Sequence, residues 1–232
     1  MTKKLPSALS NFKKVVGENC VYIDKTAAIH QLEQQGSYHL LTRPHGFGKS
    51  LFLSMLEHYY DARHASDFET LFSDLAIGKY PTASKNSYQV LFLEFAHLTG
   101  TTPEAICASF TQRLEQGFLA HLQRYQYPAA SYTTIQTANS AAAKTAAFFT
   151  LLAKQKILLL LDNYNGFAEE LALYQLALWQ ALKENTEFLA TLKAFYSSLQ
   201  TATQRGCLDR VLLVGLRPYC KMMLNRLSLP CA

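Results

Sequence analysis

The chain alternates short apolar runs with longer helical stretches, and this alternation limits the folds open to it. The four runs are 38–42, 88–95, 157–161 and 210–215. Because they are continuously apolar instead of alternating with polar residues, they are typical of buried strands in a parallel sheet covered on both faces. Helices between such strands supply the crossovers. The sequence therefore predicts an α/β fold of three layers, with a mostly parallel central sheet and a single domain over 1–232.

The longest helix is expected to begin at Pro103 and to end before Pro128. Its apolar residues recur every four positions, as on one helix face: Ile106, Phe110, Leu114, Phe118 and Leu122. A second helix is expected over about 138–154, with three buried side chains, Phe148, Leu151 and Leu152. A third region, over about 168–200 and rich in Leu and Ala, is predicted to be helical with a break near Asn185.

The N-terminal part is predicted to hold one strand-like run and one helix before the first core strand. The run 21–23 is rich in β-forming residues, and Asp24 or Thr26 can cap the helix that begins with Ala27. Gly36 is expected to end that helix. The run 38–42 then reads as a short buried strand.

Composition excludes several classes of protein. Lys and Arg number 22 against 17 Asp and Glu, but the basic residues are scattered, so nucleic-acid binding is not indicated. The longest strongly apolar run, 157–161, is far shorter than the roughly 20 residues that span a bilayer, and no secretory signal is visible. Five widely spaced cysteines without a CxxC pair favour reduced thiols in the cytoplasm and argue against zinc.

A glycine loop lies between the run 38–42 and an amphipathic helical stretch. It comprises Arg43, Pro44, His45, Gly46, Phe47, Gly48, Lys49 and Ser50, and Leu51 follows. The phosphate-binding pattern G-x-x-x-x-G-K-[ST] is matched at Gly48, Lys49 and Ser50, but Arg43 stands at the first glycine. In that pattern the lysine reaches the β- and γ-phosphates and the hydroxyl ligates Mg²⁺. The alternative is a surface turn that happens to contain Gly-Lys-Ser.

Two acidic residues end neighbouring strand candidates. Asp162 follows 157–161, where a carboxylate can hold the water shell of Mg²⁺ in a Walker B arrangement. The next residue is Asn163, whose amide cannot take a proton from an attacking water as a Glu would. Glu94 is the candidate substitute base if its strand neighbours that of Asp162. The alternative for Glu94 is a carboxylate that simply faces solvent.

Several segments, in this order, resemble the bacterial AAA-ATPase-like proteins. They are Leu5-Pro6, Phe12, Tyr22-Ile23-Asp24-Lys25-Thr26, Leu41-Thr42-Arg43-Pro44, Phe47-Gly48-Lys49-Ser50-Leu51 and Leu161-Asp162-Asn163-Tyr164-Asn165. The family hallmarks are a Tyr-Val-Asp-Lys-Thr segment, an Arg-Pro-Arg-Arg-Phe-Gly-Lys-Ser loop and an Ile-Asp-Glu-Tyr-Asp Walker B. The resemblance spans about 5–221 and implies a P-loop NTPase of the additional-strand type. It also implies ATP on Lys49 and Ser50, and Mg²⁺ at Ser50 and Asp162.

The departures from the family pattern fall at catalytic positions. His45 and Gly46 replace two loop arginines, and Asn163 and Asn165 replace the Glu and Asp of Walker B. The run 210–215 resembles a sensor-1 strand, but Val214 stands where a Thr is usual. The 17 residues after Gly215 leave no room for the usual last strand and lid, so a shortened member is expected, with Arg217 as the candidate arginine finger.

Three functions remain open on the sequence. The first is a protein that binds ATP–Mg²⁺ with weak or lost hydrolysis. The second is an active ATPase that uses Glu94 as a displaced base. The third is an interaction module without nucleotide, which meets a protein partner or a second copy through an open C-terminal edge; five apolar residues there fit such a face, namely Met222, Met223, Leu224, Leu227 and Leu229.

Overall fold

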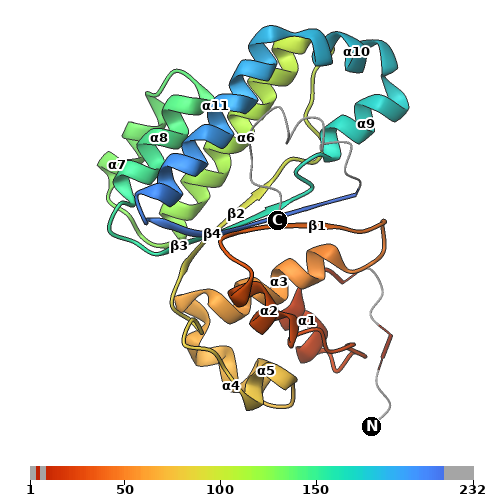
Figure 1. Ribbon diagram of the computed structural model, residues 1–232, viewed down its shortest axis with the longest axis vertical. Coiled ribbons are helices and arrows are strands. Elements are labelled where there is room, and N and C mark those ends of the chain that lie inside the picture. The colour runs from red at the N-terminus through yellow and green to blue at the C-terminus, as the bar shows by residue number, and fades with distance from the viewer. Residues whose placement is uncertain (1–3, 6–8, 217–232) are drawn as a thin grey trace.

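The computed structural model describes residues 4, 5 and 9–216, and its centre is a four-stranded parallel sheet (Figure 1). The strands are β1 (Tyr38–Thr42), β2 (Gln89–Glu94), β3 (Ile157–Asp162) and β4 (Leu208–Gly215). Their order is β1-β4-β3-β2, and every neighbouring pair is parallel. The four predicted strands and the parallel sheet are therefore confirmed. The calls on Arg217 and on the apolar residues from Met222 to Leu229 lie outside the described residues.

Helices cover both faces of the sheet, which gives three layers (Figure 1). The lower layer holds α1 (Phe12–Gly17), α2 (Ala28–Gln34), α3 (Lys49–Tyr60), the 3₁₀ helix η1 (Ala62–Asp67), α4 (Phe68–Phe72) and α5 (Ala76–Lys79). The upper layer holds α6 (Pro103–Arg124), α7 (Ala129–Gln136), α8 (Ala141–Leu151), α9 (Gly166–Tyr174), α10 (Leu176–Glu184) and α11 (Thr186–Gln204). None of the helices in the described part of the chain is long and apolar enough to cross a membrane.

The two faces of the sheet carry separate cores. Along β3, Leu158 and Leu160 pack into the lower core with α3, while Leu159 and Leu161 pack into the upper core with α6 and α11. Every β3 residue is buried. Since side chains of a strand alternate between faces, a strand covered on both sides must be apolar throughout. The continuous run in the sequence follows directly from this position in the middle of the sheet.

The helix predictions are mostly confirmed. All five residues of the α6 stripe are fully buried, and Asn185 caps α11 by accepting a hydrogen bond from Phe188 N. Leu151, predicted to be buried, is 36% exposed, because the core face of α8 carries Phe148 and the residue four positions on, Leu152. The helix α7 was not predicted, because the composition of Ala129–Gln136 favours neither a helix nor a loop.

The N-terminal predictions need three corrections. The run 21–23 forms no strand, and α2 is preceded by Ala27, without a side-chain cap. Thr26 donates to Asp24, so both predicted caps are used elsewhere. The strand β1 is half-buried instead of buried, with Leu40 42% exposed, because among the described strands it pairs with β4 alone. Gly36 has φ +94° directly after α2, as expected for the residue that ends a helix.

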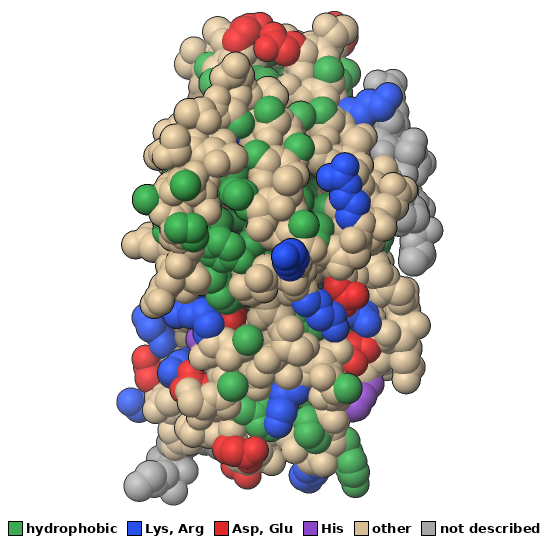
Figure 2. Space-filling model, turned by 90° about the vertical axis from the view of Figure 1, so that its left-hand side faces the viewer, with side chains coloured by type: hydrophobic (Ala, Val, Ile, Leu, Met, Phe, Trp, Pro, Cys, Tyr) green, Lys and Arg blue, Asp and Glu red, His purple; other side chains and the backbone are tan. Residues whose placement is uncertain are grey.

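The face over α7 and α8 shows how charge is distributed on the surface (Figure 2). Acidic and basic side chains are interspersed over its lower half, and few charges lie over the helices of the upper half. On this face, the described side chains form no extended patch of one sign.

The end of β4 is closely packed against the segment that follows β3. Tyr164 N donates to the Val214 carbonyl oxygen at 3.1 Å, and Tyr164 is buried. A Cβ atom on Gly215 would fall well inside van der Waals contact of the Tyr164 ring and the Asn165 side chain. Only glycine therefore lets these two chain segments approach so closely.

We expect Gly215→Ala to lower the free energy of unfolding by about 1–3 kcal/mol, because the added methyl group must displace buried side chains. Urea denaturation of the variant and the wild type measures this. Gly17→Ala is the matched control, since no atom lies within 4 Å of a Cβ built on Gly17 and alanine favours helix. Equal stability of the Gly215→Ala variant and the wild type would contradict the close approach described above.

Candidate functional site

The glycine loop 43–48 lies at the carboxyl end of the sheet, where the direction of strand connection reverses. The chain leaves β1 into the lower layer, while β4, its neighbour, is reached through the upper layer. In open α/β sheets, ligands bind in the crevice at such a switch point. Arg43 N donates to the Gly215 carbonyl oxygen at 3.2 Å and so ties the start of the loop to the end of β4.

The loop leads into α3 through two residues with left-handed backbone. Gly46 has φ +78° and Gly48 has φ +71°, values that favour glycine. Gly48 is the N-cap of α3, and no side chain caps this helix. The first backbone N–H groups of α3 are therefore left for a ligand at the positive end of the helix dipole. His45 and Phe47 are exposed on the loop, and Leu51 packs partly against the lower core.

Lys49 is folded back onto the loop that precedes it. Its Nζ donates to the carbonyl oxygens of Arg43 at 3.0 Å and Pro44 at 2.9 Å, and the residue is 8% exposed. Burial lowers the pKa of Lys49, while the negative charges of Asp162 and Glu169 oppose that effect. The ammonium group is thus held inside the loop and faces acidic side chains on the β3 side.

Ser50 and Asp162 form the link between α3 and β3. Ser50 Oγ donates to Asp162 Oδ2 at 2.6 Å, and Asp162 is 4% exposed at the end of β3. The backbone N–H of Asn163 donates to the other carboxylate oxygen at 2.9 Å. A hydroxyl and a carboxylate are oxygen ligands of the kind Mg²⁺ prefers, and here they come from the two elements expected to share the ion. The residues present therefore fit a magnesium ion.

Glu94 and Asp162 end neighbouring strands in the same row of the sheet. They are directly paired in the β2–β3 register, so the predicted neighbourhood of the two strands is confirmed. Glu94 is exposed, and Asn163 Nδ2 lies 3.5 Å from its Oε1. Asn163 itself has φ +49°, a left-handed conformation that asparagine tolerates better than most residues. Val214, at the sensor position, is fully buried in the lower core and offers no polar group.

Two cavities flank the loop on opposite sides. One, of about 440 Å³, lies between α2, the end of β1 and the start of α3; its lining includes Lys25, Gln31 and Arg43. The other, of about 520 Å³, lies towards α9; its lining includes His45, Glu169 and Trp179. Basic side chains therefore line the cavity on the β1 side, and an acidic one lines the cavity on the β3 side.

Lys25 is the residue near the loop that reasoning from sequence missed. Its segment, Asp24-Lys25-Thr26, was interpreted as the cap of a helix. In the structure, a Cβ built on Gly48 would lie 3.9 Å from Lys25 Nζ. The signal in the sequence was the family segment itself, which contains this lysine, but nothing local indicated that it meets the loop.

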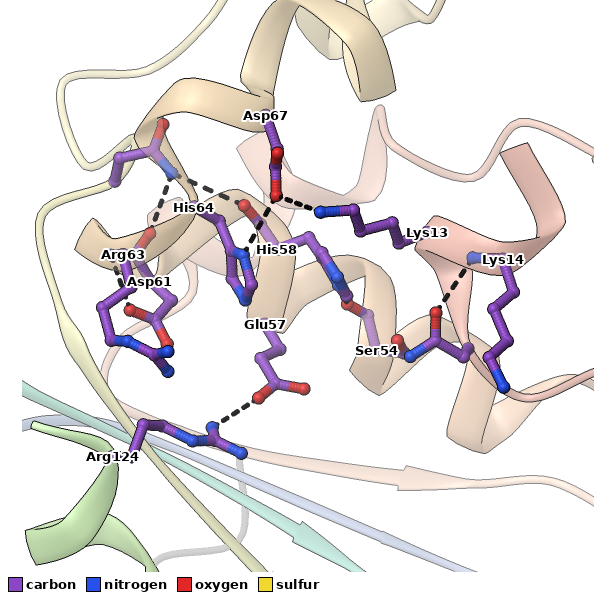
Figure 3. Close-up of polar contacts among 12 residues, drawn as sticks. Lys13, Lys14, Ser54, Glu57, His58, Asp61, Arg63, His64, Asp67 and Arg124 are labelled. Carbon is purple, nitrogen blue, oxygen red and sulfur yellow. Dashed lines mark hydrogen bonds and ion pairs between the residues drawn. The ribbon is translucent and has the colours of Figure 1, made fainter. Parts of the chain in front are cut away.

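A second polar cluster lies at the other end of α3 (Figure 3). Glu57, Asp61 and His64 bring possible metal-ligating atoms within 4.8 Å of one another. Each is already engaged: Glu57 with Arg124 at 2.5 Å, Asp61 with Tyr125 Oη at 2.8 Å, and His64 with Asp67 at 3.4 Å. These contacts join α3 and η1 to α6, so they explain the cluster as part of the packing between these helices.

Comparison with known proteins gives three findings. The chain is 47% identical over 55 residues to a protein of Azotobacter chroococcum mcd 1, described as an uncharacterized protein in the vnfD 5' region. That stretch covers 23% of this chain and only 11% of the relative. No solved structure gives a significant match. The model of the AAA-ATPase-like family, described as predicted AAA-ATPase, matches residues 6–225, and the chain therefore belongs to the AAA-ATPase-like family.

Proposed function

We propose that this chain binds ATP together with Mg²⁺ at the loop 43–48 and hydrolyses it weakly or not at all. The observation that carries the proposal is the hydrogen bond from Ser50 to Asp162, beside the loop that holds Lys49. It brings together a hydroxyl and a carboxylate, the two oxygen donors that a phosphate-bound magnesium ion would need, at the switch point of the sheet. Family membership supports the same class of ligand.

The roles of the side chains follow from their present partners. Lys49 gives its hydrogen bonds to the Arg43 and Pro44 carbonyl oxygens, and we expect it to exchange them for oxygens of the β- and γ-phosphates. Ser50 and Asp162 would hold the magnesium ion, which when bound supplies positive charge to the phosphates. The uncapped N–H groups of α3 add donors at the same place.

Weak hydrolysis is proposed because the groups that activate water are replaced. Asn163 cannot act as a base, and the buried Val214 cannot orient a water molecule. Loss of a general base commonly costs about 10²–10⁴-fold in rate. Holding the nucleotide needs neither group, so binding and turnover are separable in this site.

The second candidate is an active ATPase with Glu94 as the base. Its support is the register of β2 and β3, in which Glu94 is paired with Asp162, the proposed magnesium ligand. The side chain is exposed and therefore accessible to a water molecule next to the phosphates. The interaction module without nucleotide, the third reading, depends on residues beyond the described part.

We propose the cytoplasm as the compartment of this protein. Cys20, Cys107 and Cys207 carry free thiols in the described part of the chain, in keeping with a reducing environment.

We predict that titration calorimetry detects saturable binding of ATP–Mg²⁺ by the wild type and that Lys49→Ala weakens it at least tenfold. A charge-assisted hydrogen bond to a buried site is worth about 1.5–3 kcal/mol, which gives a loss of this size. Lys193→Ala, which removes an exposed charge from α11, is the control and should bind like the wild type. Absence of saturable binding by the wild type, or equal binding by Lys49→Ala, would contradict the proposal.

Phosphate release under saturating ATP–Mg²⁺ decides between the two candidates. We expect turnover at or near the background rate in the wild type, and no further change in Glu94→Gln. If the wild type turns over and Glu94→Gln lowers the rate by about 10²–10⁴-fold with binding intact, Glu94 is the base and the second candidate holds. Glu184→Gln, an exposed carboxylate at the end of α10, is the matched control.

A further inference from the structure

The segment 24–26 is fixed to the lower layer by both of its outer side chains. Asp24 accepts hydrogen bonds from Thr26 N at 2.8 Å, from Thr26 Oγ1 at 2.6 Å and from Ala76 N at 2.8 Å. Thr26 is fully buried, and its hydroxyl accepts from Ile77 N at 3.2 Å. Burial alone would raise the pKa of Asp24, but the hydrogen bonds outweigh it and the pKa is lowered. The carboxylate is thus a stable acceptor that holds the segment in place.

Lys25, between these two anchors, points the other way. Its side chain is exposed, and its Nζ lies 3.9 Å from the position of a Cβ on Gly48, at the start of α3. Lys49 Nζ, by contrast, is bonded at the other end of the loop, to Arg43 and Pro44. Two ammonium groups therefore border the loop at different points. Within the described chain, no carboxylate pairs with Lys25, so its charge is available to a ligand.

The orientation of a bound nucleotide follows from the strand order. Ser50 and Asp162 fix the β/γ end of the phosphate chain on the β3 side. With that end on the β3 side in the proposed function, we place the nucleoside on the β1 side of the loop, away from β3. The cavity of about 440 Å³ lies there, with apolar walls that include Ala28 and Phe52 and with Lys25 and Arg43 beside them. The cavity on the other side is lined by Glu169 and, among the described residues, by no lysine or arginine.

The geometry points to Lys25 as a second phosphate-binding lysine, which contacts the nucleotide on the nucleoside side of the loop and not at its β/γ end. Asp24 and Thr26 are positioning residues for it, since they hold its backbone without facing the ligand. This inference rests on the proposed function, because it assigns a further contact to the same nucleotide. It gives the Asp24-Lys25-Thr26 segment a role in binding instead of in capping α2.

The test compares ATP–Mg²⁺ binding by the wild type, Lys25→Ala, Lys25→Arg and Lys79→Ala in titration calorimetry at low salt. We expect Lys25→Ala to weaken binding about tenfold and Lys25→Arg to restore most of it, because the charge returns. Lys79→Ala is the control: Lys79 is exposed at the end of α5, the helix that binds Asp24 and Thr26, and its loss should leave affinity within twofold. Equal affinity of Lys25→Ala and Lys79→Ala would overturn the inference.

A second pair of variants tests the side on which the nucleoside lies, with inorganic tripolyphosphate–Mg²⁺ as a probe that has no nucleoside. Ala28→Trp fills the cavity beside Lys25 and should weaken ATP at least tenfold while tripolyphosphate binds nearly as before. Ala172→Trp fills the opposite cavity and should leave both ligands unaffected. The reverse pattern would overturn the placement. If the wild type binds tripolyphosphate and ATP, and the Lys25→Ala variant binds ATP with the same affinity as the wild type, only this inference fails. If the wild type binds neither ligand, the proposed function fails as well.

Discussion

The hydrogen bond from Ser50 Oγ to Asp162 Oδ2 is the contact on which the site depends, because it joins elements that are not neighbours in the sheet. Ser50 belongs to the helix that follows β1, Asp162 ends β3, and β4 lies between these strands. The helix α3 reaches β3 from the lower layer, where residues of both elements share one core. At the end of β4, Gly215 lets the segment that follows β3 pack closely, since a side chain there would collide with Tyr164 and Asn165.

Charge is divided along the carboxyl edge of the sheet. Lys25, Arg43 and Lys49 lie on the β1 side, and Asp162 and Glu94 lie at the ends of β3 and β2. A chain of phosphates with a metal ion at one end matches this division, because its anionic part meets the cations and its metal meets the carboxylates. The Lys49 ammonium is buried and donates to two backbone carbonyl oxygens of the loop, which satisfies a charge that would otherwise be costly to bury.

Features that depend on local sequence could be predicted, and features that depend on the strand order could not. The burial of the α6 stripe and of β3 could be predicted, because each follows from a pattern of apolar residues within one element. The half-burial of β1 reflects its position in the sheet, where β4 is its one neighbour among the described strands, and no local pattern encodes this position. Likewise Asp24 was read as a cap, although its carboxylate binds Ala76, a residue 52 positions away. The pairing of Glu94 with Asp162 was predicted only on the condition that the strand order is that of the additional-strand NTPases, and no local pattern could fix that order.

In the proposed function, binding of nucleotide and activation of water draw on different residues of this edge, and Lys49, Ser50 and Asp162 are the ones that keep the family residue. Lys49, Ser50 and Asp162 come from the loop and β3, and they are held by contacts that also stabilise the fold. The contact of Asn163 with Asp162 is made by its backbone N–H, and Val214 packs into the lower core, so neither side chain takes part in the contacts of Lys49, Ser50 and Asp162. The geometry is therefore compatible with the proposed function, in which the nucleotide is bound and turnover is weak or lost. In the second candidate function the base is Glu94, whose position in β2 is paired with that of Asp162 in β3.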